Sequence, residues 1–500
     1  MTSIMHRPFM LAALTAALAG CSLAPTYERP VSPVSATYPA GEAYVPPRPA
    51  QGPAAQAPVA DIGWRDFYAD PLLQQLISMA LSANRDLRVA ALNVEQARAQ
   101  YRIQRADVLP SVGVGGEGSV QRVPADLSST GSSAINRSYQ VGAAASWELD
   151  LFGRIRSLSD QALENYLAQD ETRIAAQLAL IAETASAYLT LRADQELLAL
   201  TQSTLASQQQ SYDLVKQSYD LGVATALDLS QAEASLRTAQ RNQAEYTRRV
   251  AQDRNALVLL AGQPLPEDIA ARLNQAKTLP DNVVPSALPP GLPSDLLMRR
   301  PDIRAAEHQL RGANAYIGAA RAAFFPRISL TGSAGTASSS LGGLFDAGSG
   351  AWSFAPSISV PIFAGGALRA ELDVAKVRKN IQIAQYERAI QVAFREVADA
   401  LAGQGTLENQ IEAQGLLVAA YQRAYDLSQS RFDQGIDDYL SVLDSQRSLY
   451  TAQQTMVETR LARLTNLVTL YRVLGGGWTE STIASQPEQG TGAAVAPGER

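Results

Sequence analysis

The side chain best placed for covalent chemistry is the thiol of Cys21, the only cysteine in the chain. It closes residues 18–21, Leu-Ala-Gly-Cys, after a positively charged start and an apolar run over residues 9–17. Such a run is typical of a secretory signal peptide and is too short to cross a bilayer. Small residues before a cysteine resemble a lipobox, in which the thiol accepts a diacylglycerol before the chain is cut ahead of it. We therefore predict a signal peptide at 1–20 and lipid attachment at Cys21. The alternative is an ordinary cleavage site that happens to contain a cysteine.

Few other side chains offer chemistry. Ser22 stands where an aspartate would favour retention in the inner membrane, so the outer membrane is the predicted destination. Beyond the signal peptide there is one histidine, His308, and the net charge of the whole sequence is −6. A single cysteine excludes intrachain disulfides and CxxC sites. Because no catalytic constellation or phosphate-binding glycine loop is present, we predict no enzyme, cofactor, metal site or nucleic acid partner.

The elements that position the remaining sites are unusually long. Residues 154–221 contain no glycine or proline, and a stretch of the same length without proline covers 367–434. A helix over the first of these would reach roughly 100 Å at 1.5 Å per residue, so it must span a distance rather than line a compact core. Leucine and tyrosine at heptad spacing favour a coiled coil with small residues between. We expect the second helix to be bent or unwound near Gly403, Gly405 and Gly415.

The chain repeats itself. Residues 86–88 match 302–304 and Pro110 matches Pro326 at an offset of 216, while Gly222 matches Gly435 at an offset of 213. A chance match would not hold register over both regions, so we predict a tandem duplication of about 210 residues. Each half then orders its elements alike. In the first half a helix over 71–109 leads to two strands, the long helix and a helix over 225–261, with the far turns at Gly222 and Gly435.

Alternation of apolar and small polar residues predicts four strands, of which the one that begins at Ile328 and Leu330 has the weakest pattern. In the second strand Val141, Trp147 and Leu149 alternate with Gln140 and Ser146. Such strands with aromatic ends are typical of a transmembrane barrel. Pro356 fits poorly inside a strand and is expected to mark a bulge. The alternative for the strands is a soluble sandwich, which would leave the long helices unexplained.

Four strands cannot close a barrel, and open edges are not tolerated in lipid. Two copies would give eight strands and a filled interior, whereas three would give twelve and leave a lumen. The predicted fold is therefore an α+β membrane protein. A transmembrane β-barrel, with four strands per chain and twelve in a trimer, continues into a long periplasmic α-helical barrel.

Several stretches resemble the outer membrane factor family, the exit ducts of tripartite efflux pumps and type I secretion systems. They are residues 300–307 (Arg-Pro-Asp-Ile-Arg-Ala-Ala-Glu), 323–326 (Ala-Phe-Phe-Pro) and 474–478 (Leu-Gly-Gly-Gly-Trp). With the lipobox, the sequence looks closest to the OprM-like lipoprotein branch of these TolC-like channels. The resemblance implies a homotrimer, an equatorial belt around the helical tube, a periplasmic adaptor protein and an inner membrane transporter of the proton-driven multidrug type.

The resemblance also implies a periplasmic gate on the turn after the second long helix. Aligned on Gly435, Leu440 matches the apolar constriction, Asp444 the acidic ring and Arg447 the basic residue that tethers neighbouring helices. Ser441 replaces the second acidic ring of TolC, which puts a double carboxylate gate in doubt. Three Asp444 carboxylates around a narrow axis would raise cation affinity. The alternative is that Asp444 is a solvated helix residue. Gly222, Asp228 and Gly435 look like the tip that meets the adaptor.

The predicted function is a passive exit duct for drugs or other small molecules in the outer membrane, driven by the transporter through the adaptor. One alternative is a type I secretion duct for proteins, and another is a structural coiled-coil lipoprotein without a pore. The predicted domains follow the chain in order. They are the signal peptide (1–20), a Pro-rich lipidated segment (21–62), the first repeat (63–277, strands about 108–122 and 138–152, long helix 154–221), a linker (278–293), the second repeat (294–478, strands about 326–338 and 351–363, long helix 367–434) and a flexible tail (479–500).

Overall fold

The computed structural model describes residues 22–44, 59–129, 131–275, 277–285, 288 and 299–482. The signal peptide, Cys21, part of the predicted linker and most of the predicted tail lie outside this set. The chain divides into two compact units, which we describe separately. The first contains the described residues up to Val31, Leu92–Asp170 and Ala305–Arg388, and the second contains the described residues of Ser32–Ala91, Glu171–Arg304 and Ala389–Arg500.

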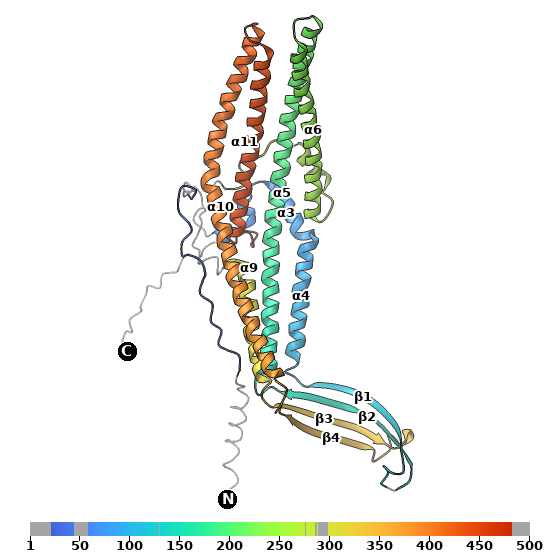
Figure 1. The fold of residues 1–500 in the computed structure, drawn as a ribbon. Coiled ribbons are helices and arrows are strands. Elements are labelled where there is room, and N and C mark those ends of the chain that lie inside the picture. Colours follow the sequence, from blue (N-terminus) through green and yellow to red (C-terminus); the bar gives the residue numbers. More distant parts are fainter. Residues whose placement is uncertain are drawn as a thin grey trace, which may run out of the picture. The chain divides into compact units, whose positions relative to one another are not determined.

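The first unit holds a four-stranded antiparallel sheet in the order β1-β2-β3-β4 (Figure 1). Its strands are β1 (Ser111–Val123), β2 (Ala134–Leu149), β3 (Arg327–Ser338) and β4 (Gly350–Ser359). The strand predicted to run to 363 ends four residues earlier. Pro361, which has no amide hydrogen to donate to a ladder, lies two residues after the end of the strand.

The register sorts the side chains by face. Val114, Ala143, Ala334 and Trp352 form one row across the four strands, and a parallel row ends in Phe354. The opposite face carries small and polar side chains, among which Ser333 and Ser353 share a hydrogen bond of 2.8 Å. Large apolar residues of the first face are exposed, with Val114 at 82% and Trp352 at 80%. One face of the sheet therefore lacks a protein partner within the described chain.

The predicted bulge at Pro356 is wrong. Pro356 lies opposite Leu330, and the pairing keeps one register from Arg327↔Ser359 to Thr336↔Gly350. An unbroken ladder tolerates proline where the missing N–H would point away from the partner strand. Because β4 is the edge strand in the described chain, that position is available.

Four long helices run through the structure, and two of them belong to both units. They are α5 (Arg154–Asp220), α6 (Ala226–Ala261), α10 (Ala367–Asp433) and α11 (Tyr439–Val473). One 18-residue window of α5 is apolar enough to span a membrane by composition, yet half of it is buried. Tyr188, Leu189 and Leu191 are completely covered, so packing against other helices accounts for its apolar character.

The single helix predicted over 71–109 is wrong, because it divides at Asn84 into α3 (Pro71–Ala83) and α4 (Arg85–Ala106). The Asn84 side-chain oxygen accepts hydrogen bonds from the backbone N–H groups of Asp86 and Leu87, at 2.9 and 3.0 Å. Its amide donates to the carbonyl of Leu260 at 3.0 Å. Asn84 thus caps one helix while bonding to a distant one, which explains the interruption.

The predicted unwinding of the second long helix is also wrong, since α10 is helical through all three glycines. A Cβ on Gly403 would lie 2.5 Å from the side-chain oxygen of Asn466 on α11. Asn466 in turn donates to the carbonyl of Ala400 at 2.9 Å. The glycine therefore permits close approach of two helices rather than a break.

In the second unit, the segment that follows α11 packs against two short elements from the first part of the chain. These are η2 (Val59–Asp61) and α2 (Trp64–Phe67). The backbone N–H of Trp64 donates to the carbonyl of Thr479 at 3.1 Å, and the Tyr471 hydroxyl donates to the carbonyl of Ile62 at 2.6 Å. The ring of Tyr471 stacks on Phe67 at 3.8 Å between centroids. A Cβ on Gly476 would lie 2.3 Å from that ring, so this glycine is required by packing.

The segment after α7 (Glu267–Gln275) is fastened to the long helices by Arg460 of α11. Its guanidinium donates to the carbonyl of Leu279 at 2.6 Å, to Asp281 at 2.8 Å and to Glu196 of α5 at 2.9 Å. Glu196 also accepts from the backbone N–H of Leu279 at 2.6 Å. The connection between the halves is therefore packed onto helices over its described residues.

Candidate functional site

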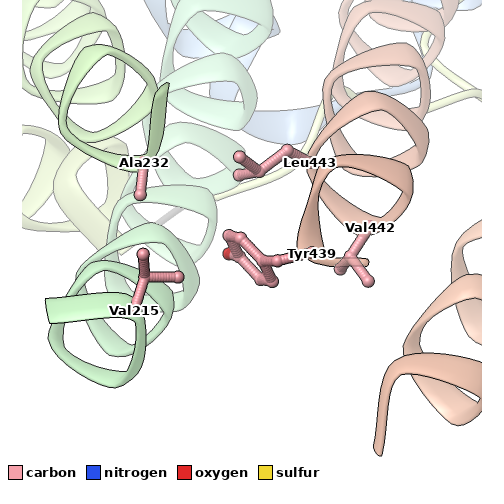
Figure 2. Close-up of a cluster of buried hydrophobic side chains, with 5 residues drawn as sticks. All are labelled: Val215, Ala232, Tyr439, Val442 and Leu443. Atoms are coloured by element: carbon pink, nitrogen blue, oxygen red, sulfur yellow. The ribbon is translucent and has the colours of Figure 1, made fainter. Parts of the chain in front are cut away.

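The residues of the predicted gate lie where α11 begins, beside the ends of α5 and α10 and the start of α6. A buried apolar cluster holds these helices together. Its members are Val215, Ala232, Tyr439, Val442 and Leu443. Figure 2 shows Tyr439 and Leu443 pointing from α11 toward Val215 and Ala232, whereas Val442 points away from them. Packing of Tyr439 and Leu443 therefore fixes the start of α11 against α5 and α6.

Leu440, Asp444 and Arg447 occupy another face of α11, at helical spacings of four and three residues. Leu440 is 44% exposed, and Asp444 and Arg447 form an ion pair on the helix surface. These three side chains line a groove of about 370 Å³ whose other wall includes Gln231 and Thr238 of α6. In the described chain Arg447 therefore neutralises the carboxylate of its own helix.

The turn before α11 is braced by charge. Gly435 has φ +71°, a conformation that glycine adopts without strain. The Arg431 guanidinium donates to both carboxylate oxygens of Asp437, at 2.5 and 2.8 Å, and these bonds lower the pKa of Asp437. Asp438 caps α11 by accepting from the backbone N–H of Ser441 at 3.3 Å. Since Asp437 and Asp438 are both engaged, the turn is held in one shape.

The matching turn of the first half has a different construction. Gly222 has φ +77°, and Thr225 and Asp228 form a reciprocal capping box at the start of α6. Hydrogen bonds from Thr225 lower the pKa of Asp228. Asp228 therefore stabilises the helix end, whereas the surface beside it is apolar. Leu221 and Val223 are each 81% exposed. We did not identify these two residues from the sequence, although apolar residues flanking a turn glycine were a visible signal.

A polar seam attaches α11 to its neighbours above the cluster, and it has no evident signature in the sequence. The side-chain amide of Gln208 on α5 donates to Gln446 on α11 at 2.8 Å, and Gln446 donates to Ser207 at 2.8 Å. Ser445 exchanges a hydrogen bond of 2.8 Å with Ser428 of α10. If α11 shifted along its neighbours, these side-chain amides and hydroxyls would lose their hydrogen-bond partners. Leaving such groups unpaired costs free energy, so the seam favours one register of α11.

Two carboxyl groups meet between α5 and α6. Burial and the neighbouring Asp194 raise the pKa of Asp253 to about 6, and burial also raises the pKa of Asp194. Arg249 opposes both shifts, while Glu245 and Glu458 add further negative charge around Asp194. Two nearby carboxylates cannot both ionise without repulsion, so one of them retains its proton to a higher pH.

Replacing Asp253 with asparagine should stabilise the protein at neutral pH. The folded state binds the Asp253 proton more tightly than the unfolded state, so the wild type loses stability as the pH rises from about 4 through about 6. Relative to wild type, the variant should gain about 1 kcal/mol at pH 8, allowing for the partial exposure of the group, and nothing near pH 4. Urea unfolding at both pH values measures this. The exposed Glu233→Gln on α6 is the control, and an equal gain at both pH values would contradict the assignment.

Cys21 lies outside the described residues, but those that follow it lie along the part of α9 (Pro301–Ala322) that belongs to the first unit. Arg321, in the last turn of α9, donates to the carbonyl of Leu23 at 2.9 Å, and Asn314 donates to that of Pro25 at 2.7 Å. The segment thus runs antiparallel to α9. Its start lies at the end of the helix that leads into β3.

The same segment is held by a buried carboxylate. Glu307, whose side chain is 6% exposed, accepts from Arg29 at 2.8 Å and from Arg311 at 2.7 Å. Burial would raise the pKa of Glu307, but hydrogen bonds from the two arginines outweigh it and lower the pKa. His308 instead contacts Glu164 at 2.6 Å. Among the described residues, no group of three or more metal-binding side chains gathers.

The model of the outer membrane efflux protein family matches this chain at residues 76–263 and at 292–476. The chain is 50% identical over 467 residues to the probable efflux pump outer membrane protein TtgC of Pseudomonas putida, covering 93% of this chain and 94% of that one. It is 46% identical to the outer membrane protein OprJ of Pseudomonas aeruginosa, covering 94% and 95%. Its fold is similar to that of the open state of the MtrE outer membrane channel of Neisseria gonorrhoeae. There the TM-score is 0.81 and the identity 41%, over 93% of this chain and 100% of the other.

Proposed function

Because this chain belongs to the outer membrane efflux protein family, we propose that it is a passive exit duct through which a tripartite pump discharges drugs or other small molecules. It is the outer membrane channel of an efflux pump. The observation that carries the proposal is the sheet, whose register gives one exposed apolar face and one small polar face. A barrel wall between lipid and water needs that arrangement.

The working unit of the proposal is a homotrimer. β1 and β4 each have one unpaired edge within the described chain, and lipid does not tolerate such edges. Twelve strands from three copies leave a lumen, whereas eight from two would be filled by side chains. The duplicated plan of the chain then supplies each copy with two long helices and two sets of shorter ones for a periplasmic tube.

Energy for transport comes from elsewhere in the proposed pump. The duct has no catalytic activity, and an inner membrane transporter of the proton-driven multidrug type supplies the work. A periplasmic adaptor protein contacts the turns at Gly222 and Gly435, where exposed Leu221 and Val223 offer apolar surface. Asp228 supports this tip by capping α6.

The proposed gate is formed by Leu440, with Asp444 and Arg447 one and two turns further along α11. Support comes from their place on the face of α11 that the buried cluster leaves uncovered. Opening requires α11 to shift against α5 and α10, which would break the polar seam at Gln446 and Ser445.

Lipid attachment at Cys21 is the proposed membrane anchor. The contact of Leu23 with Arg321 supports it, because the start of the described chain then lies next to the helix that enters the sheet. The anchor adds affinity for the outer membrane but forms no part of the conduit.

Conductance in planar lipid bilayers tests the proposed duct. The purified full chain should run as a heat-sensitive trimer on denaturing gels and should open discrete, long-lived channels. Boiled protein, which retains the sequence but not the assembly, is the control. A heat-resistant monomer without conductance would instead support the structural lipoprotein.

A further inference from the structure

The apolar face of the sheet carries two arginines at the hairpin end of the strands, which is distant from the helices. Along β2 this face presents Leu149, Trp147, Val141 and Tyr139, with alanines between, and then Arg137. On β1 it ends at Arg122. Pairing of Arg122 with Ile135 and of Val120 with Arg137 makes the two arginines diagonal neighbours on one face.

Both guanidinium groups lack a protein partner within the described chain. Arg122 and Arg137 are exposed, and neither forms an ion pair or a side-chain hydrogen bond with any described residue. Glu117, the nearby acid on β1, lies on the opposite face and accepts from Gln140 at 3.0 Å. The acids of the two hairpin loops, Asp126 and Asp346, form no ion pair with either arginine. Two positive charges therefore stand unneutralised side by side.

Their height matches a membrane boundary. Arg137 precedes Trp147 by ten residues on the same face of β2. At roughly 3.4 Å per residue and a tilt of about 40°, this places Arg137 roughly 25 Å above Trp147, the height of the apolar band of a barrel. No charged side chain interrupts that face between Trp147 and Arg137. In the proposed duct the arginines would therefore reach headgroup level on the side away from the helices, which would face the cell exterior.

We propose that Arg122 and Arg137 bind the phosphate groups of phosphorylated glycolipid in the outer leaflet. A guanidinium matches phosphate oxygens with two parallel N–H donors, and its long stem can lie along the apolar band below. The adjacent Tyr139 supplies the aromatic side chain expected at such a boundary. This contact rests on the proposed insertion of the sheet in the membrane, but its loss would leave channel conductance intact.

Native mass spectrometry of the full-length trimer can test this contact, with lipid A bearing both phosphates and the same lipid without phosphates as probes. The wild type should retain the phosphorylated form preferentially. Arg122→Gln with Arg137→Gln should reduce retention roughly fivefold per arginine, as expected for single cations at an anionic lipid surface. Arg122→Lys with Arg137→Lys should retain most of the binding. Arg237→Gln with Arg248→Gln, which removes two exposed cations from α6, is the matched control.

Equal retention of both lipids, or equal retention by the glutamine variant and the control, would overturn the proposal. So would displacement of lipid A by an equal concentration of inorganic phosphate, because that outcome would indicate a general anion site. Loss of the heat-sensitive trimer in the glutamine variant alone would identify an ion pair between copies instead. Unchanged conductance in a variant that no longer binds the lipid separates this contact from the duct itself.

Discussion

Single-channel conductance should rise severalfold when Leu440 and Asp444 are both replaced with alanine. Three copies of Leu440 converging on one axis would form the narrowest apolar constriction, and truncating each to a methyl group widens it and lowers the cost of wetting. Leu440 is already 44% exposed, and Asp444 makes no contact with the buried cluster, so the fold should tolerate both changes. Planar bilayer recordings of the purified trimer measure the effect.

A matched variant on α10 separates gating from general loosening. Asp426→Ala with Leu427→Ala removes the same atoms from an exposed part of the neighbouring helix. It should leave conductance close to that of the wild type. If the α11 variant behaves like this control, then the constriction lies elsewhere and the assignment of Leu440 is wrong.

Ion selectivity should depend on both Arg447 and Asp444, with opposite signs. Each Asp444 carboxylate is paired with Arg447 on its own helix, so the two charges largely cancel at a distance. Arg447→Gln would leave three uncompensated carboxylates and should increase cation preference. Asp444→Asn would instead leave three uncompensated guanidinium groups and should shift selectivity toward anions. Reversal potentials under a salt gradient distinguish these outcomes from that of an unpaired acidic ring.

The sequence predicts the long elements well because their signals are repeated many times. Apolar and small polar residues alternate along strands of ten or more residues. All alternate positions along β2 therefore indicate the same apolar face. The 67 helical residues of α5 contain no glycine or proline to interrupt them. Family membership was likewise visible, since residues 300–307 and 474–478 carry it in short motifs.

Features that depend on a single distant contact could not be predicted. Asn84 divides α3 from α4 partly because its amide reaches Leu260, which is 176 positions away. Gly403 looked like a helix breaker, but its role is to admit Asn466 from α11. The neutralisation of Asp444 by Arg447 depends on rotamers rather than on residue types. In the first two cases the local sequence permits several conformations, and a partner from another helix selects one.

Replacing Arg300 with leucine should destabilise the protein by about 3 kcal/mol, the cost typical of breaking a buried ion pair by removing one partner. The Arg300 side chain is only 7% exposed and donates to Glu396 of α10 at 2.9 Å, to Asp302 at 2.6 Å and to the carbonyl of Val473 at 3.2 Å. Burial alone would lower its pKa, but bonds and charges from Asp302 and Glu396 raise it, so the cation is strongly preferred.

A second substitution decides whether the loss comes from charge or from packing. In Arg300→Leu the Glu396 carboxylate, only 25% exposed, loses its cation, whereas Arg300→Leu with Glu396→Leu leaves only the Asp302 carboxylate, which is 43% exposed and can be solvated. Replacing both members of a buried pair with apolar side chains is often close to neutral, so the double variant should recover most of the lost stability. Arg237→Leu, which breaks an exposed pair with Glu233, should cost less than about 1 kcal/mol. Urea unfolding of the wild type and these three variants measures the losses. A double variant no more stable than Arg300→Leu would mean that Val473 and the shape of the site, rather than the ion pair, make Arg300 necessary.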